Sequence, residues 1–267
     1  MCNCGKNEYT PVPSKLQDII KHTAQEWTFR FTYVGDVKPG QFFQISIPKV
    51  GECPISVSGI GPDYVDLTLR AVGKVTDYLF ENFKAGDSLF LRGPYGNGFD
   101  VHEFEGGELI IVVGGTAVSP VRGVVQYLCE TESAKDVHMI AGFKDPGEIM
   151  FKADLKDWAE KIDLTLTVDG APEGYEGKVG LVTKYIPDIP IRDISKCKAI
   201  VVGPPPMIRF SMIELVKRGL SEDNVWISDS RRMSCGIGKC GHCRINDKYV
   251  CIDGPVFKFS EHKTLID

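Results

Sequence analysis

The sequence predicts a multi-domain protein: an antiparallel β-barrel, then an α/β domain built on a parallel sheet, then a cysteine-rich loop. Three observations predict this order. Short β-rich runs with Gly and Pro turns fill the first part, apolar strands alternate with helices through the middle, and four cysteines lie close together near the end. We place the domains at residues 1–103, 104–224 and 225–267.

The length and composition fit this division. At a prior of about 150 residues per domain, a chain of 267 residues suggests two domains. The net charge of −5 does not fit a nucleic-acid partner, which usually requires a basic surface. The apolar runs fall far short of the roughly 18 residues of a membrane helix, so we expect no membrane span.

The cysteines indicate the compartment. The first ten residues contain no apolar stretch of a secretory signal. Nine cysteines without such a signal fit a reducing cytoplasm and metal binding better than disulfides. Cys2 and Cys4 lie in the N-terminal segment, where two thiols alone cannot complete a metal site, and we expect a frayed end there.

The first domain is predicted to be a small antiparallel barrel, because short alternating runs recur at regular spacing with turn residues between them. We expect its strands at residues 27–33, 41–47, 55–58, 64–70 and 88–92. A helix is expected at residues 76–83, with Thr76 as its N-cap. The apolar stripe of this helix consists of Tyr78, Leu79 and Phe83.

The pattern changes near Gly106. Residues 108–113 form a continuous apolar run, as in a strand that is buried on both faces of a parallel sheet. Strands and helices then alternate, which implies helices on both faces of that sheet. We expect further strands at residues 137–142, 163–168, 199–203 and 224–228. We expect helices at residues 119–128, 151–160, 180–186 and 206–218.

The cysteine-rich loop has the spacing Cys-x4-Cys-x2-Cys-x7-Cys, which is typical of plant-type [2Fe-2S] clusters held by thiolates. The expected ligands are Cys235, Cys240, Cys243 and Cys251. Glycines lie between them, where a tight loop needs backbone with positive φ. The alternative is a structural zinc ion, although zinc sites usually separate two close Cys pairs by a longer gap.

Two loops that follow predicted strands indicate a nucleotide site. Glycines after a strand let a phosphate approach the backbone, and open α/β sheets bind ligands at the carboxyl ends of their strands. Each loop alone also fits an ordinary turn, but two of them on one sheet favour a nucleotide cleft. The residues concerned are Gly114, Gly115, Thr116 and Ala117 in the first loop, and Gly203, Pro204, Pro205 and Met207 in the second.

The barrel contains a further anion-binding arrangement. Gly73 precedes the helix expected at 76–83, whose N-terminus favours negative charge, and Arg70 adds a fixed positive charge. Ser56, in the run 54–58, would place a hydroxyl in a flavin pocket. The alternative is that these residues belong to plain barrel strands.

Taken together, these motifs resemble the ferredoxin–NADP reductase superfamily, in the branch whose C-terminal tail carries a [2Fe-2S] cluster. That branch includes the electron-transfer subunits of dihydroorotate dehydrogenase and of anaerobic sulfite reductase. The segments most similar to the sulfite reductase protein are residues 51–58, 70–76, 92–98, 231–243 and 250–257.

The resemblance implies that the barrel binds FAD and that the two glycine-containing loops bind the nicotinamide dinucleotide. It places the isoalloxazine beside Pro54, Ile55, Ser56 and Val57, and the pyrophosphate beside Arg70, Gly73, Val75 and Thr76. Many members of the superfamily carry an Arg just before this flavin motif. Here Cys53 to Ser56 contain no Arg and Glu52 has the opposite charge, so we expect Arg70 and the helix N-terminus to balance the pyrophosphate.

Asp169 indicates which dinucleotide binds. It follows the strand expected at 163–168, where an acid can accept from a ribose 2′-hydroxyl and repels a 2′-phosphate. We therefore expect NADH rather than NADPH. The alternative is a solvated acid in a turn.

The resemblance implies an electron-transfer flavoprotein. NADH would give a hydride to FAD, with Ser56 as the catalytic hydrogen-bond partner near flavin N5, and single electrons would leave through the cluster. The implied partners are the ferredoxin-like iron–sulfur subunit and the sirohaem subunit of a complex that reduces sulfite to sulfide. The alternatives are the same role in a dihydroorotate dehydrogenase or hydrogenase complex, or a non-enzymatic zinc-binding scaffold.

Overall fold

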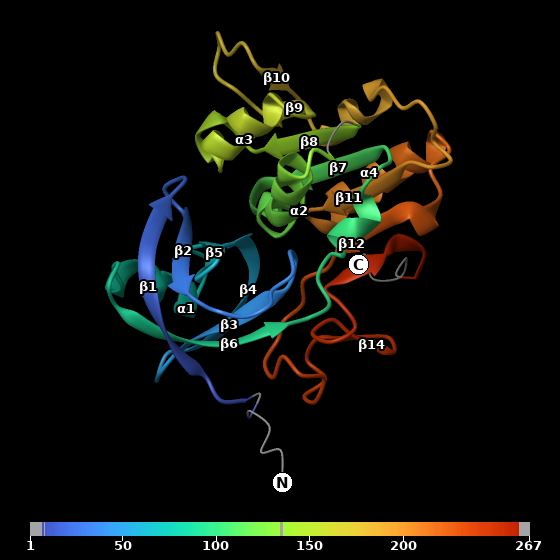
Figure 1. Cartoon of the computed structure of the whole chain (residues 1–267). Helices are drawn as coiled ribbons and strands as arrows, with labels where there is room; N and C mark the ends of the chain where they lie inside the picture. Colours follow the sequence, from blue (N-terminus) through green and yellow to red (C-terminus); the bar gives the residue numbers. More distant parts are fainter. Residues whose placement is uncertain (1–6, 8, 134–135, 262–267) are drawn as a thin grey trace.

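A computed structural model describes residue 7, residues 9–133 and residues 136–261 (Figure 1). It shows a closed barrel of six strands, a seven-stranded sheet with helices, and a C-terminal loop region with a short hairpin. In Figure 1 the barrel lies at the lower left, the sheet at the upper right and the loop region, in red, below the sheet. Cys2 and Cys4 lie outside the described residues.

The barrel has the strand order β1-β2-β5-β4-β3-β6, which confirms the predicted antiparallel barrel. Its strands are β1 Val12–Lys21, β2 Glu26–Thr32, β3 Phe42–Ile47, β4 Gly51–Ile60, β5 Tyr64–Arg70 and β6 Ser88–Tyr95. Alternate side chains such as Phe29, Phe43 and Leu67 fill the interior and are fully buried. Strand β1 was not among the predicted strands. Only Ser14 and Leu16 in it are buried, so its sequence does not show the alternation of apolar and polar residues that is typical of a strand.

The barrel helix, α1, covers Lys74–Asn82 and closes one end of the barrel with the fully buried Leu79. Its N-cap is Gly73, so the prediction of Thr76 as N-cap was wrong. Thr76 lies in the first turn, where its hydroxyl oxygen accepts from the N–H groups of Val72 and Gly73 at 3.1 and 3.0 Å. The Thr side chain therefore caps the helix by reaching back, in the manner of a capping box.

The α/β domain has the sheet order β10-β9-β8-β7-β11-β12-β15, parallel except for β15. Helices α2 and α3 pack on one face and α4 on the other, around two separate apolar cores. The strands are β7 Leu109–Gly114, β8 Val137–Phe143, β9 Asp163–Val168, β10 Lys178–Val179, β11 Lys198–Val202, β12 Val225–Ser228 and β15 Val256–Lys258. The helices are α2 Val118–Glu130, α3 Lys152–Ala159 and α4 Pro205–Lys217.

Two features of this domain differ from expectation. The helix predicted at 180–186 is replaced by 3₁₀ turns at Val182–Lys184 and Ile186–Asp188, because Gly180 has a φ of +134° and Pro187 interrupts any longer helix. The sheet also takes β12 and β15 from the segment that we assigned to the tail.

Among the described residues, no helix combines the length and the apolar character needed to cross a bilayer.

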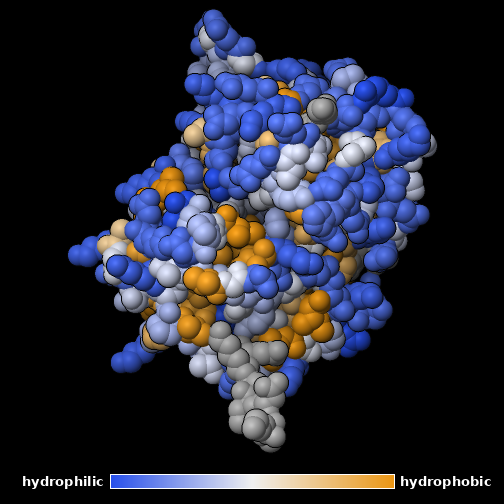
Figure 2. All heavy atoms as spheres, in the orientation of Figure 1, coloured by the Kyte–Doolittle hydropathy of each residue, from blue (hydrophilic) through white to orange (hydrophobic). Residues whose placement is uncertain are grey.

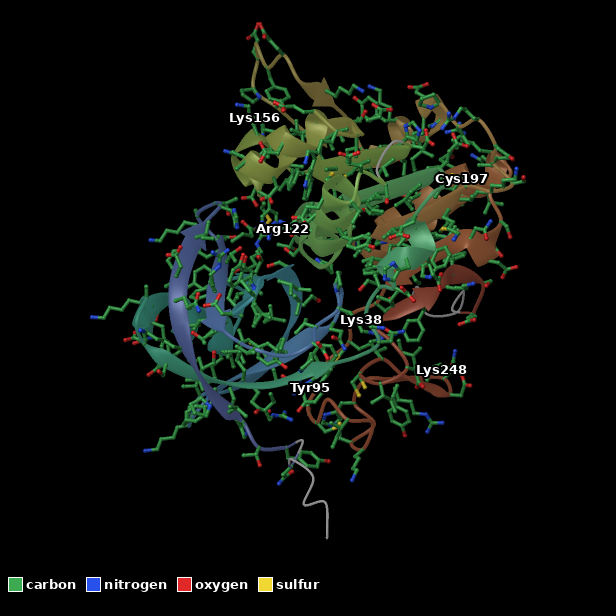
Figure 3. All side chains as sticks on the ribbon, in the orientation of Figure 1. Lys38, Tyr95, Arg122, Lys156, Cys197 and Lys248 are labelled. Atoms are coloured by element: carbon green, nitrogen blue, oxygen red, sulfur yellow. The ribbon has the colours of Figure 1, made fainter. Side chains whose placement is uncertain are left out.

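Arg122 of α2 joins the two domains (Figure 3). Its guanidinium donates to Asp154 of α3 at 2.8 Å and to the backbone oxygen of Ser58 in the barrel at 2.9 Å. Asp66 of β5 lies 3.7 Å from the same guanidinium. Sliding of the barrel against the α/β domain would cost this largely buried cation its hydrogen bond to Ser58 and its contact with Asp66.

Candidate functional site

The cysteine-rich loop leaves the sheet at the end of β12 and returns to it as β15, which pairs with β12. Between these strands lies a short hairpin of β13 Arg244–Ile245 and β14 Lys248–Tyr249. The three glycines between the first cysteines, Gly236, Gly238 and Gly241, have φ values of +77°, +70° and +81°, as expected. Both ends of the loop are therefore anchored on one sheet edge.

The four thiols of this loop lie in two pairs. Cys235 contacts Cys240, and Cys243 contacts Cys251. Backbone N–H groups point at the sulfurs: Gly238 donates to Cys251 at 3.1 Å, and residues 239 and 240 donate to Cys235 at 3.3 and 3.4 Å. Within the described part of the chain, no three His, Cys, Asp or Glu side chains gather as for a single metal ion. Two thiol pairs are what two bridged irons require.

The thiol environments are unequal. Burial raises the pKa of Cys235, but backbone N–H donors from residues 237, 239 and 240 outweigh it and lower that pKa to about 6. Cys243 and Cys251 are buried, and burial raises the pKa of Cys251. Cys240 is exposed. The environment of Cys235 therefore favours a thiolate at neutral pH, and the ligand set is exposed at Cys240.

The two glycine-containing loops meet at the carboxyl edge of the sheet. A Cβ on Gly114 would lie 2.6 Å from the Met207 sulfur, and one on Gly203 would lie 2.3 Å from the Met207 methyl carbon. Gly115 has a φ of +58°, and no described atom lies within 4 Å of its Cβ position. This open backbone before α2 fits a phosphate. Asp169 is exposed at the end of β9, on the same edge.

Strand β4 presents two of the predicted flavin residues outward. Ile55 and Val57 pack into the barrel core, so Pro54 and Ser56 face the other side. Phe42 of β3 lies opposite Ser56 and belongs to the apolar core shared by the α/β domain and the loop region. Pro54 and Ser56 therefore face the junction of the three parts of the molecule.

The N-terminus of α1 adjoins the same strand. A Cβ on Gly51, at the start of β4, would lie 3.1 Å from the Val75 side chain. The first N–H groups of a helix lack acceptors within it, and no described atom lies within 4 Å of a Cβ position on Gly73. Gly73, Val75 and Thr76 are therefore brought together at an open helix N-terminus that fits a pyrophosphate.

Arg70 differs from what the resemblance implies. Its guanidinium lies 3.2 Å from Glu26 and 3.7 Å from Glu148, and it donates to Gln25 at 2.8 Å. The side chain is 42% exposed, so it stays accessible, but two carboxylates already share its charge. Its role at the pyrophosphate remains a prediction.

Two known protein families match the cysteine-rich loop and the α/β domain. Residues 230–262 match the "Iron-sulfur cluster binding domain of dihydroorotate dehydrogenase B", and residues 111–212 match the "Oxidoreductase NAD-binding domain". The first match covers the thiol pairs and the second covers the carboxyl edge of the sheet.

Two relatives extend over nearly the whole chain. The sulfhydrogenase 2 subunit gamma of Pyrococcus furiosus is 31% identical, with 95% of this chain and 96% of that protein covered. The probable dihydroorotate dehydrogenase B (NAD(+)) electron transfer subunit of Thermoplasma volcanium is 34% identical over 92% of this chain and 89% of that protein. The chain belongs to the family that contains these gamma and electron-transfer subunits.

Membership of this family makes the chain an oxidoreductase subunit of the NAD-dependent, flavin and iron–sulfur type, and its cofactors are FAD, a [2Fe-2S] cluster and NADH. The thiol pairs, the open glycine loop and the α1 N-terminus fit these groups, and the iron–sulfur match favours iron over the zinc alternative. A solved NADH-dependent reduced ferredoxin-NADP oxidoreductase has the same fold, with a TM-score of 0.79 and 24% identity over 93% of this chain and 88% of that one.

The sequence reasoning missed Arg92 as a site residue. This β6 side chain is 5% exposed and makes a two-pronged contact with Glu52, at 2.9 and 2.6 Å. Glu52, whose charge did not fit a pyrophosphate site, is thus neutralised by Arg92. The available signal was a charged residue inside an otherwise apolar strand, in a segment that we singled out by resemblance alone.

Proposed function

We propose that this chain is the electron-transfer subunit of a multi-subunit oxidoreductase, linking NADH through FAD and the [2Fe-2S] cluster to a partner subunit. The observation that carries the proposal is the position of Arg92. It contacts Glu52, two residues before Pro54 of the proposed flavin strand, and the backbone oxygen of Cys235, the first cluster ligand. A flavin on β4 and a cluster in the loop would therefore lie on two sides of one guanidinium.

When bound, the cofactors supply hydride transfer and single-electron transfer. The protein residues bind and orient them. The edge formed by Gly114, Gly115 and Gly203 would hold the dinucleotide, and the Ser56 hydroxyl would hydrogen-bond near flavin N5. Pro54 would cover one face of the ring and exclude water, while the buried Cys243 and Cys251 shield one half of the cluster.

The relatives favour a hydrogenase or a dihydroorotate dehydrogenase as the partner complex, because their names describe subunits of such enzymes. Sulfite reduction is a second candidate, which rests on the resemblance of residues 231–243 to the electron-transfer subunit of anaerobic sulfite reductase. Mixing the pure chain with the remaining subunits of each candidate complex, and measuring electron transfer to or from NAD, distinguishes the hydrogenase, dihydroorotate dehydrogenase and sulfite reductase roles. We expect H₂-dependent or dihydroorotate-dependent NAD reduction, and NADH oxidation driven only by sulfite would support the second candidate instead.

The exposed basic residues near Cys240 suit a partner with an acidic docking surface. We call the exposed residues Arg232, Lys239, Arg244 and Lys248 the basic rim; they lie within a few residues of the cluster cysteines in the sequence and outnumber the exposed acids Asp247 and Asp253 of the same stretch, in a chain whose net charge is −5. A cavity of about 430 Å³ lies between β6 and the loop and is lined in part by the exposed apolar residues Val12 and Ile252. Figure 2 shows apolar patches in this lower part of the molecule. The cysteines of the described residues are free thiols, which supports a location in the reducing cytoplasm.

Charge reversal tests this docking surface. Replacing Arg244 and Lys248 with Glu is expected to slow electron transfer to the partner about tenfold at low salt and to flatten its salt dependence, because steering by opposite charges is lost. The measurement is the partner reduction rate against ionic strength. Lys156→Glu, on α3 far from the tail (Figure 3), is the control. If the partner reduction rate depends on ionic strength equally in the double variant and the native chain, the basic rim does not steer the partner.

Asp169 tests the dinucleotide preference. Asp169→Asn is expected to lower kcat/KM for NADH about tenfold and to narrow the preference over NADPH, because a charged acceptor for the ribose is lost. Glu173→Gln, an exposed acid in the next turn, should leave the ratio as it is. If Asp169→Asn also leaves the NADH/NADPH ratio of kcat/KM unaltered, this acid does not select the dinucleotide.

A further inference from the structure

The segment that ends β6 contacts both ends of the cysteine-rich loop. At the entry of the loop, Arg92 donates to the backbone oxygens of Ser234 and Cys235 at 3.1 and 3.0 Å. At its exit, Asn97 donates from its side chain to the backbone oxygen of Val256 at 2.7 Å and accepts from the N–H of Val256 at 3.1 Å. Two residues five positions apart thus hold backbone on either side of all four cysteines.

Arg92 uses its whole guanidinium in this contact. Its five N–H groups reach five acceptors: the two carboxylate oxygens of Glu52, the hydroxyl of Tyr95, and the two loop carbonyls of Ser234 and Cys235. Burial of a cation is costly unless every donor is satisfied. The complete set of acceptors therefore exists only while the loop is seated on the barrel.

Two glycines allow the close approach of loop and barrel. A Cβ on Gly236 would lie 2.9 Å from the Tyr95 ring, and one on Gly96 would lie 2.8 Å from the backbone oxygen of Gly254. The Asn97 N–H also donates to the backbone oxygen of Gly254 at 2.7 Å. The contact is therefore a fitted surface along residues 92–97 and not a single ion pair.

We propose that residues 92–97 form a platform that positions the cluster, with Arg92 as the positioning residue for the first cysteine and Asn97 for the return after the last. Glu52 holds Arg92 from β4, so the platform links the flavin strand to the cluster loop and sets their relative position. This inference rests on the proposed function for the cluster in the loop.

Hydrogen exchange of the cluster-loaded chain tests the platform without relying on turnover. Arg92→Gln is expected to speed exchange of the loop amides at residues 234–241 about tenfold, because local opening costs less once these contacts are lost. Asn97→Ala is expected to do the same for the amides of residues 253, 254, 256 and 257. Arg92→Lys should behave like Arg92→Gln, since an ammonium cannot supply the planar fork. The cluster EPR spectrum of both Arg92 variants should broaden.

Arg30→Gln is the matched control. Arg30 makes an equally two-pronged contact with Asp66, at 2.7 and 2.9 Å, elsewhere in the barrel. It should lower the melting temperature but leave loop exchange and the EPR spectrum unchanged. Native exchange and native EPR in Arg92→Gln would overturn the platform, as would equal effects of Arg30→Gln on the loop. A native chain that binds its cluster but takes no electrons from NADH would instead refute the proposed function.

Discussion

Cys240→Ser is expected to abolish the [2Fe-2S] signal in electron paramagnetic resonance and most of the bound iron, while NADH still reduces FAD in the same chain. Cys240 pairs with Cys235 at the exposed end of the ligand set. A serine hydroxyl is far less acidic than a thiol, so it does not supply the anionic ligand that a thiolate supplies. The proposed nucleotide edge and flavin strand involve other elements, so flavin reduction should stay within about twofold of the native rate.

Cys197→Ser is the control for this experiment. Cys197 is a buried thiol in the core beneath α4, outside the loop. Burial raises its pKa to about 12, so it stays a thiol and should not contribute to the cluster. Its variant should keep the full signal. Joint loss of cluster and flavin reduction in Cys240→Ser would show that the two sites do not work separately.

Gly73→Val is expected to produce a stable protein with at least about tenfold less bound FAD. Gly73 has an extended backbone, with a φ of −177°, which valine adopts without strain. No described atom lies within 4 Å of the new Cβ, so the side chain would enter the open space at the α1 N-terminus. That space is where we place the pyrophosphate, and the branched side chain would exclude it.

The flavin absorbance of the purified variant, taken with its melting temperature, measures this effect. Gly107→Val is the matched control, because Gly107 lies at the opposite edge of the sheet and its Cβ position is 3.9 Å from the nearest described atom. It should keep its flavin. Full flavin occupancy in Gly73→Val would place the pyrophosphate elsewhere and would remove Gly73, Val75 and Thr76 from the site.

The parts of the fold that depend on local pattern were predictable. The spacing of Cys235 to Cys251 identifies the cluster without any knowledge of the rest of the chain. The apolar run at residues 108–113 is buried on both faces, so its strand was found almost to the residue as Leu109–Gly114. In β1 only two of the ten side chains are buried, and so few buried positions gave a pattern too weak to identify a strand.

The contacts that assemble the site could not be predicted in the same way. Arg92 meets Cys235 and Asn97 meets Val256 across more than half of the chain, and no local spacing encodes such pairs. Thr76 was recognised as a capping residue, but its position in the first turn depends on the course of Val72 and Gly73. The ion pair of Arg70 with Glu26 likewise appears only once β5 pairs with β2.

An anaerobic titration of the pure protein with NADH, followed in the visible region, tests the central claim most directly. We expect a coloured, iron-containing protein whose flavin and cluster absorption both fall as NADH is added, with the reduced-cluster signal appearing in electron paramagnetic resonance at the same time. A colourless, iron-free protein whose spectrum does not respond to NADH would contradict the account.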